Sequence, residues 1–114
     1  SKYYNMGKFE ITQRTNNEYQ FNLKAGNHEV ILTSEGYTTM DACKGGVESV
    51  KKNALIDQNF ERKESTNGKH FFNLKAANGQ AIGRSEMYET KASMENGIAS
   101  VMKNVETATL ENQS

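Results

Sequence analysis

The chain contains two copies of one segment. When it is aligned with itself at a shift of 51 residues, residues 9–53 match 60–104 without a gap, and about 20 of the 45 pairs are identical. The densest match is the pair of five-residue runs at 21–25 and 72–76, which are the same in both copies. Because solenoids need at least three repeats, two copies predict a pseudo-twofold pair of units.

Each copy predicts three strands joined by tight turns. Phe9 and Ile11 alternate with polar residues, and so do Tyr19, Phe21 and Leu23, which is typical of strands with one buried face. A third strand follows in each copy, over 29–34 and over 80–85. Turns are expected at the asparagine-containing dipeptides, which tolerate positive φ: 16–17, 27–28, 67–68 and 78–79.

The apolar pattern then changes to the period of a helix. Thr39 and Thr90 are suitable N-caps, and Asn53 and Asn104 are suitable left-handed C-cap residues. One apolar stripe follows each cap, formed in the first copy by Ala42, Cys43, Gly46, Val47 and Val50 and in the second by Met94, Gly97, Ile98 and Val101.

Glycine stands in the middle of both expected helices, where it costs about 1 kcal/mol relative to alanine. The two positions, Gly46 and Gly97, are equivalent in the repeat. We therefore expect the helix backbone at these points to approach a strand too closely for a side chain.

These patterns predict an α+β fold: two tandem βββα(β) repeats forming one antiparallel sheet with two helices packed on it. The repeats span residues 1–57 and 58–114 and form one compact domain, because a three-stranded meander alone is marginal. Residues 54–56 and 107–110 are expected to form short trailing strands that are exchanged between the copies. With 35% hydrophobic residues, the shared core is expected to be thin.

Charge and cysteine content narrow the function classes. The 14 basic and 14 acidic residues cancel, which does not favour a nucleic-acid partner. The single cysteine, Cys43, favours a reducing compartment. No apolar run reaches the length of a membrane span and no signal peptide is visible, so the expectation is a cytoplasmic protein without a membrane partner.

The second copy contains a set of distinctive runs, and the first carries drifted versions of them: 72–80, 82–83, 85–88, 95–98, 100–101 and 103–104. In these runs the chain resembles the YegP-like family. The resemblance implies paired βββα-β units in one sheet with an exchanged trailing strand. Single-copy members pair as dimers, so a tandem chain is expected to be a monomer with an internal pseudo-dimer. The family is uncharacterised, so it implies no catalytic or binding residues.

Few residues suggest reaction chemistry. His28 aligns with Gly79, His70 with Tyr19, and Cys43 with Met94, so none of the three is repeated, and structural roles are favoured. No zinc set, cofactor or catalytic constellation is expected.

Two serine–glutamate pairs are repeated, Ser34-Glu35 and Ser85-Glu86. They are either functional or strand ends that bond nearby backbone, and the second interpretation is favoured. Tyr37 and Tyr88 are expected to pack in the corner between strand and helix.

The remaining candidate is a repeated polar surface. Asn22 and Lys24, and their equivalents Asn73 and Lys75, alternate with the apolar residues of the strands and so face away from the helices. This face would suit an anionic ligand or an extended partner; alternatively it is an ordinary solvated surface.

The leading hypothesis is a non-catalytic binding or interaction module that uses this polar face. The alternative is nucleic-acid binding, for which Lys24, Lys63, Lys75 and Arg84 would have to cluster. A low-turnover enzyme is the least favoured. The sequence names no ligand and no partner.

Overall fold

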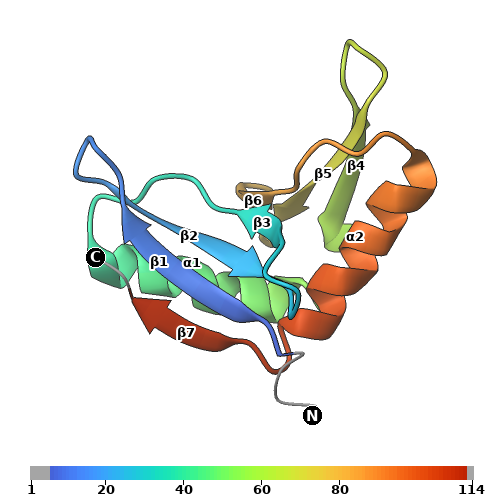
Figure 1. The fold of residues 1–114 in the computed structure, drawn as a ribbon. Coiled ribbons are helices and arrows are strands. Elements are labelled where there is room, and N and C mark those ends of the chain that lie inside the picture. The colour runs from blue at the N-terminus through green and yellow to red at the C-terminus, as the bar shows by residue number, and fades with distance from the viewer. Residues whose placement is uncertain (1–5, 113–114) are drawn as a thin grey trace.

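The computed structural model describes residues 6–112 and contains one sheet and two helices. The strands lie in the order β4-β5-β6-β3-β2-β1-β7, and both helices pack on one face of the sheet (Figure 1). The elements are β1 (Lys8–Gln13), β2 (Tyr19–Lys24), β3 (Val30–Thr33), α1 (Met40–Asn53), the 3-10 turn η2 (Asp57–Asn59), β4 (Phe60–Glu64), β5 (His70–Lys75), β6 (Ala81–Arg84), α2 (Lys91–Asn104) and β7 (Thr109–Asn112).

Each repeat forms the expected antiparallel meander. In β1 and β2, Phe9 lies opposite Leu23 and Ile11 opposite Phe21, and all four side chains are fully buried. Since side chains alternate across a strand, this pairing sends one apolar row toward the helices. The turns fall where the sequence predicts them, and the second residue of each has positive φ: Asn17, His28, Gly68 and Gly79.

The two meanders meet at the centre of the sheet through a short contact. The only residues of β3 and β6 in register are Thr33 and Arg84. With so little pairing between them, the two outer hairpins, β1–β2 and β4–β5, diverge like the arms of a V (Figure 1). The polar face of the sheet lies between these arms.

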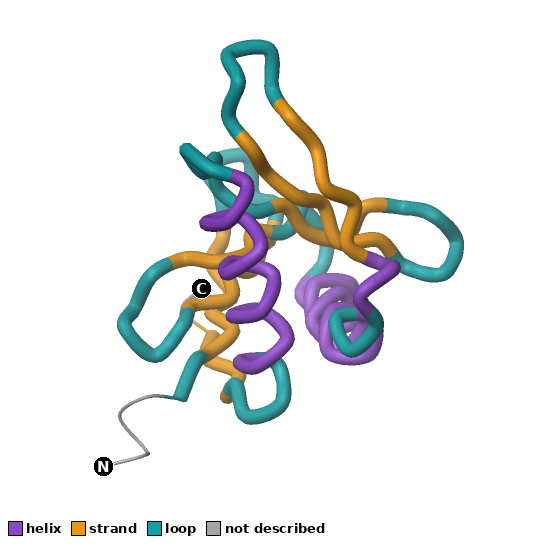
Figure 2. The backbone as a smooth tube through the Cα atoms, turned by 90° about the vertical axis from the view of Figure 1, so that its right-hand side faces the viewer, coloured by secondary structure: helices purple, strands orange, loops and turns teal. Residues whose placement is uncertain are grey.

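The helices join the two repeats into one core. Helix α1 contacts β2 of its own repeat and β5 and β6 of the other, while α2 contacts β5 and β3. Figure 2 shows the two helices in crossed directions, one along its length and the other nearly end-on. Buried apolar residues of both copies, all except Phe71, form a single cluster, which confirms the shared core.

The helix starts are as predicted, but the helix ends differ. The hydroxyls of Thr39 and Thr90 accept hydrogen bonds from Ala42 N and Ser93 N, as N-caps do. The prediction of left-handed C-caps at Asn53 and Asn104 is wrong. Both are buried within the last helical turn, where each side-chain amide donates to the carbonyl oxygen four residues earlier.

The close approach expected at the helix glycines is present, with a different neighbour. A Cβ on Gly46 would lie 2.7 Å from Tyr37 Cζ and 3.0 Å from Phe21 Cε2, and one on Gly97 would lie 2.7 Å from Tyr88 Cζ. The tyrosine rings of the strand-to-helix corners therefore fill the space that a side chain would need.

The trailing segments behave differently in the two copies. Strand β7 crosses to the first repeat, as predicted, but it pairs with β1 in parallel, so the sheet is mixed and not wholly antiparallel. The strand predicted at 54–56 is wrong: these residues form a turn that leads through η2 into β4. The first copy has only a few residues before its chain must start β4, so no length remains for a separate trailing strand.

Within residues 6–112, neither helix has the length and apolar character needed to cross a membrane.

Candidate functional site

The four predicted site residues lie on the sheet face opposite the helices, but in two separate places. Asn22 and Lys24 belong to β2, and Asn73 and Lys75 belong to β5. Strands β3 and β6 lie between β2 and β5. The polar face thus carries two equivalent clusters, one on each arm of the V.

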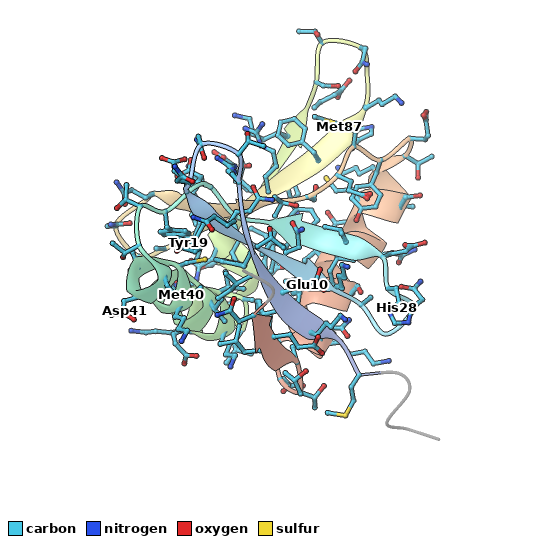
Figure 3. The ribbon with its side chains drawn as sticks, turned by 60° about the vertical axis from the view of Figure 1, so that its left-hand side comes forward. Glu10, Tyr19, His28, Met40, Asp41 and Met87 are labelled. Atoms are coloured by element: carbon cyan, nitrogen blue, oxygen red, sulfur yellow. The ribbon has the colours of Figure 1, made fainter. Side chains whose placement is uncertain are left out.

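The first cluster is organised by a glutamate on β1. The Glu10 carboxylate lies 2.9 Å from Lys24 Nζ and 3.7 Å from Lys8 Nζ, and the residue is only 7% exposed. Thr33 Oγ1 donates to Asn22 Oδ1 at 2.8 Å. Glu10 can be followed on β1 in Figure 3.

The second cluster repeats this arrangement on β4 and β5. The Glu61 carboxylate lies 3.1 Å from Lys75 Nζ and accepts a hydrogen bond from Asn73 Nδ2 at 3.3 Å. Asn73 Oδ1 in turn accepts from Arg84 Nε at 3.1 Å. The equivalent of Thr33 is Arg84 and the equivalent of Lys8 is Asn59, so each cluster holds two cations, placed differently around its glutamate.

The sequence reasoning missed the two glutamates. Glu10 and Glu61 are identical residues at equivalent positions of the repeat, and each directly follows a buried phenylalanine, so the same comparison could have found them. They matter because a carboxylate already stands beside each predicted lysine. An anion bound at Lys24 or Lys75 would have to compete with it.

Hydrogen bonds from the lysines set the protonation of both glutamates. The hydrogen bond from Lys24 lowers the pKa of Glu10, against the opposing effect of burial. The hydrogen bonds from Lys75 and Asn73 lower the pKa of Glu61 in the same way. Both carboxylates are therefore charged at neutral pH and well below it.

These pKa shifts predict acid sensitivity. A carboxylate whose folded pKa lies below its usual value of 4.5 stabilises the fold above that pH, and this contribution is lost as the pH falls through the lowered pKa. We expect Glu10→Gln to cost up to about 1 kcal/mol of unfolding free energy at about pH 6.5 and less at about pH 3, as the carboxylate becomes protonated. Urea unfolding at the two pH values measures this. Glu106→Gln, at an exposed glutamate without an ion pair to any described residue, is the control, and an equal loss at both pH values for Glu10→Gln would contradict the assignment.

A cleft of about 490 Å³ lies where the two repeats meet. It opens on the polar face and reaches one of the predicted residues, Asn73. Its lining comes from both copies: Arg14, Thr33, Ser34, Glu35, Gly36, Asn73, Ala81, Gly83, Arg84, Ser85 and Glu86.

The two serines of the cleft are structural, as the sequence favoured. Ser34 Oγ accepts from Phe21 N at 2.9 Å and donates to Glu35 O at 2.8 Å. Ser85 makes the equivalent bonds with the backbone of Phe72 and Glu86. Each hydroxyl thus closes the end of a strand and is not available as a nucleophile.

The charged side chains of the cleft are more available than the serines to bind a ligand. The Arg84 guanidinium lies 5.2 Å from the centre of the Phe71 ring and uses only its Nε to bond Asn73, so its two Nη atoms bond no described residue. Glu35 and Glu86 are exposed and make no ion pair with any described residue. The cleft therefore presents free groups of both charge signs.

The three residues that could have carried reaction chemistry lie apart from this cleft. Cys43 is fully buried, and burial raises the pKa of its thiol, so the predicted packing role is confirmed. His28 lies in the exposed turn between β2 and β3 (Figure 3), and His70 opens β5, where its backbone pairs with Tyr88. Within residues 6–112 no three His, Cys, Asp or Glu side chains are grouped as metal ligands.

Comparison with known proteins agrees with the repeat and the fold. The family described as "Domain of unknown function (DUF1508)" matches twice, at residues 15–61 and 65–112. The UPF0339 protein YegP of Escherichia coli is 46% identical over 95% of this chain and 98% of its own length. A UPF0339 protein of Bordetella pertussis is 45% identical over 96% of this chain and 98% of its own length.

Two solution NMR structures have the same fold. The structure of Escherichia coli YegP, described as a protein of unknown function, superposes with a TM-score of 0.90 over 95% of this chain and 93% of that one, at 46% identity. The structure of a UPF0339 protein of Shewanella oneidensis gives a TM-score of 0.88 over 93% and 90%, also at 46% identity. With both repeats matched, and with relatives this similar over nearly their whole length, the chain belongs to the YegP-like UPF0339 family of proteins with two DUF1508 repeats, whose function is uncharacterised.

Proposed function

We propose that this chain is a non-catalytic binding module whose ligand contacts the polar face of the sheet, centred on the cleft between the two repeats. The observation that carries the proposal is that the cleft holds both positive and negative groups without an ion-pair partner among the described residues. The positive group is the pair of Arg84 Nη atoms, and the negative groups are the Glu35 and Glu86 carboxylates. The volume of about 490 Å³ is in the range of small-molecule sites.

The chemistry of the lining indicates the class of ligand. Arg84 is held in place by Asn73 and by the Phe71 ring, so its two Nη atoms are oriented to bind a carboxylate. Glu35 and Glu86 complement an ammonium or guanidinium group. A polar ligand that carries both charge signs, such as an amino acid or a short peptide, fits this arrangement better than a simple anion.

Asn22 and Lys24 extend the same face on the first arm, and Asn73 and Lys75 on the second. In the proposal Asn73 reaches the ligand at the cleft, while Lys24 and Lys75 remain paired with their glutamates and border it. In the proposal, Asn73 thus contributes most to binding among these four residues.

The test is a titration of the ¹⁵N-labelled protein with a panel of free amino acids and dipeptides, followed by amide chemical shifts. We expect shifts at 33–36 and 84–86, and Arg84→Gln should weaken the binding by about tenfold to a hundredfold, since a charge-assisted pair is worth roughly 1.5–3 kcal/mol. Lys44→Gln, at an exposed lysine on α1, should bind as the parent does. Shifts confined to the helical side, or none from any compound, would reject the site.

Nucleic-acid binding has weaker support. The cations that would have to cluster are interspersed with acids, because Lys24 and Lys75 each lie against a glutamate and Arg84 shares the cleft with Glu35 and Glu86. A polyanion needs a surplus of positive charge on one face. The least favoured possibility, a low-turnover enzyme, has little support, because both serines of the cleft are bonded to backbone groups.

A further inference from the structure

The outer edge of β4 is equivalent to a strand edge that is occupied in the other repeat. Strand β4 corresponds to β1 at the repeat distance of 51 residues, and β1 carries β7 along its outer edge. Strand β4 ends the sheet, and within residues 6–112 no strand pairs with its outer edge. The β4–β5 hairpin projects from the body of the molecule, at the top of Figure 2.

The backbone of β4 directs hydrogen-bonding groups toward this edge. Arg62 and Glu64 lie opposite Phe72 and His70 of β5. Phe72 O accepts from Ser85 N, and His70 N and O bond the backbone of Tyr88, so both residues direct their backbone groups away from β4.

Opposed residues in an antiparallel pair either both bond across it or both face outward. The N–H and C=O groups of Arg62 and Glu64 therefore point outward. Those of Phe60 do so too, but Phe60 N donates to Asp57 O, and Phe60 O accepts from Arg62 Nη1 at 3.2 Å. A strand that docks opposite Phe60 therefore requires Arg62 Nη1 to leave Phe60 O. The same alternation directs the backbone of Ile11, the equivalent of Arg62, toward β7.

We propose that the outer edge of β4 binds an extended segment of a partner protein as an added parallel strand, in the register that β7 uses on β1. There, Leu110 lies opposite Phe9 and Asn112 opposite Ile11. The equivalent partner positions would lie opposite Phe60 and Arg62. Main-chain hydrogen bonds would give the affinity, and the side chains at these two partner positions would give the selectivity.

The position opposite Phe60 suits an aliphatic side chain. Leu55 and Ile56 precede β4 and are 57% and 52% exposed, more than any other large hydrophobic residue described. In addition, Met102 stands at the position equivalent to Lys51, whose Nζ lies 5.8 Å from the centre of the Phe9 ring. The β4 edge is therefore more apolar at this point than the β1 edge that already holds Leu110.

The position opposite Arg62 disfavours an acidic side chain. Arg62 Nη2 lies 2.9 Å from Asp57 Oδ1, and Arg62 Nε lies 2.8 Å from Glu95 Oε2. Two carboxylates around one cation leave this corner negative, so a neutral or basic side chain fits better. Arg62 and Lys63 also charge the edge itself, which limits indiscriminate pairing with other strands.

A peptide with the sequence of the β7 segment can be used to test binding at this edge. A peptide of residues 105–112 carries leucine opposite Phe60 and asparagine opposite Arg62, as the two positions require. When it is titrated into the ¹⁵N-labelled full chain, we expect amide shifts at 55–56 and 60–64 and none in β1, where β7 is held intramolecularly. The same peptide with Leu110→Asp should not bind.

Two variants at residue 62 distinguish the contribution of its backbone N–H to peptide binding from that of its side chain. Arg62→Ala and Arg62→Pro both remove the ion pairs, but only proline removes the outward N–H. We expect Arg62→Ala to bind the peptide at least as tightly as the parent does, because it also frees Phe60 O from Arg62 Nη1, and Arg62→Pro to bind at least about tenfold more weakly than Arg62→Ala, the effect of about 1.4 kcal/mol. If Arg62→Pro does not fold, the two peptides still decide between edge binding and none.

Several results would overturn the proposal: no shifts at millimolar peptide, shifts only in β1, or equal binding of the two peptides. Broadening at 60–64 that grows with protein concentration alone would identify a second copy of the chain as the occupant and would also overturn it. None of these results bears on the cleft, whose residues lie on other strands.

Discussion

Replacing Gly46 by leucine is expected to destabilise the protein by about 3 kcal/mol or more, toward the upper end of the cost of overpacking a core. The added Cβ alone would meet the rings of Tyr37 and Phe21, which stack with their centres 6.3 Å apart. Phe21 is fully buried and cannot give way, and Tyr37, whose backbone is paired with Tyr19, would have to turn its ring out of the core to make room. Urea unfolding followed by circular dichroism measures the loss.

The adjacent residue offers a matched control. A Cβ on Gly45 would meet nothing within 4 Å, so Gly45→Leu should be neutral or should stabilise α1 by about 0.5–1 kcal/mol through helix propensity. The repeat supplies a second test, since Gly97 stands against Tyr88 as Gly46 stands against Tyr37. Gly97→Leu should be destabilising too, and a variant as stable as the parent would refute the packing argument.

Separating the repeats is expected to abolish the monomeric fold of each half. Residues 1–57 alone would lack β7, which covers the edge of β1, and would lack β5 and β6, on which α1 packs. The apolar face of the first meander would then be exposed to water, and a single meander buries too little apolar surface to fold stably by itself. We expect a disordered circular dichroism spectrum for 1–57, and recovery of the native spectrum when it is mixed with 58–114.

Size-exclusion chromatography completes this experiment. A mixed complex of the mass of one intact chain would support the boundary between 57 and 58 and the internal pseudo-dimer. A single half that pairs with itself would agree with the behaviour that the family resemblance implies for single-copy members. A folded, monomeric 1–57 would contradict the shared core.

The repeat made most of the fold predictable. Alternation in Phe9, Ile11, Phe21 and Leu23 identified the strands, and the threonines identified the helix starts. These features depend on interactions between near neighbours, and each was visible twice. The errors concern the helix ends, the segment at 54–56 and the parallel pairing of β7, where the outcome depends on what the following chain must reach.

The candidate site was predicted only in part. The strand pattern placed Asn22, Lys24, Asn73 and Lys75 on the correct face, but it did not show that a glutamate on the neighbouring strand lies beside each lysine. It also did not show the cleft, which exists because β3 and β6 pair at a single register position. Contacts between strands depend on register, and register is decided by the packing of the whole sheet.

The repeat by itself thus determined that this chain has two equivalent βββα units and which side chains of each are buried, because alternation and helical periodicity are local properties. Only the tertiary structure decided how the copies differ: β7 pairs with the edge of β1, while the first copy's chain continues into β4, whose outer edge pairs with no strand of residues 6–112. The reason is connectivity. Two units related by a twofold offer two equivalent edges, and only the second unit is followed by chain that is free to pair with one of them.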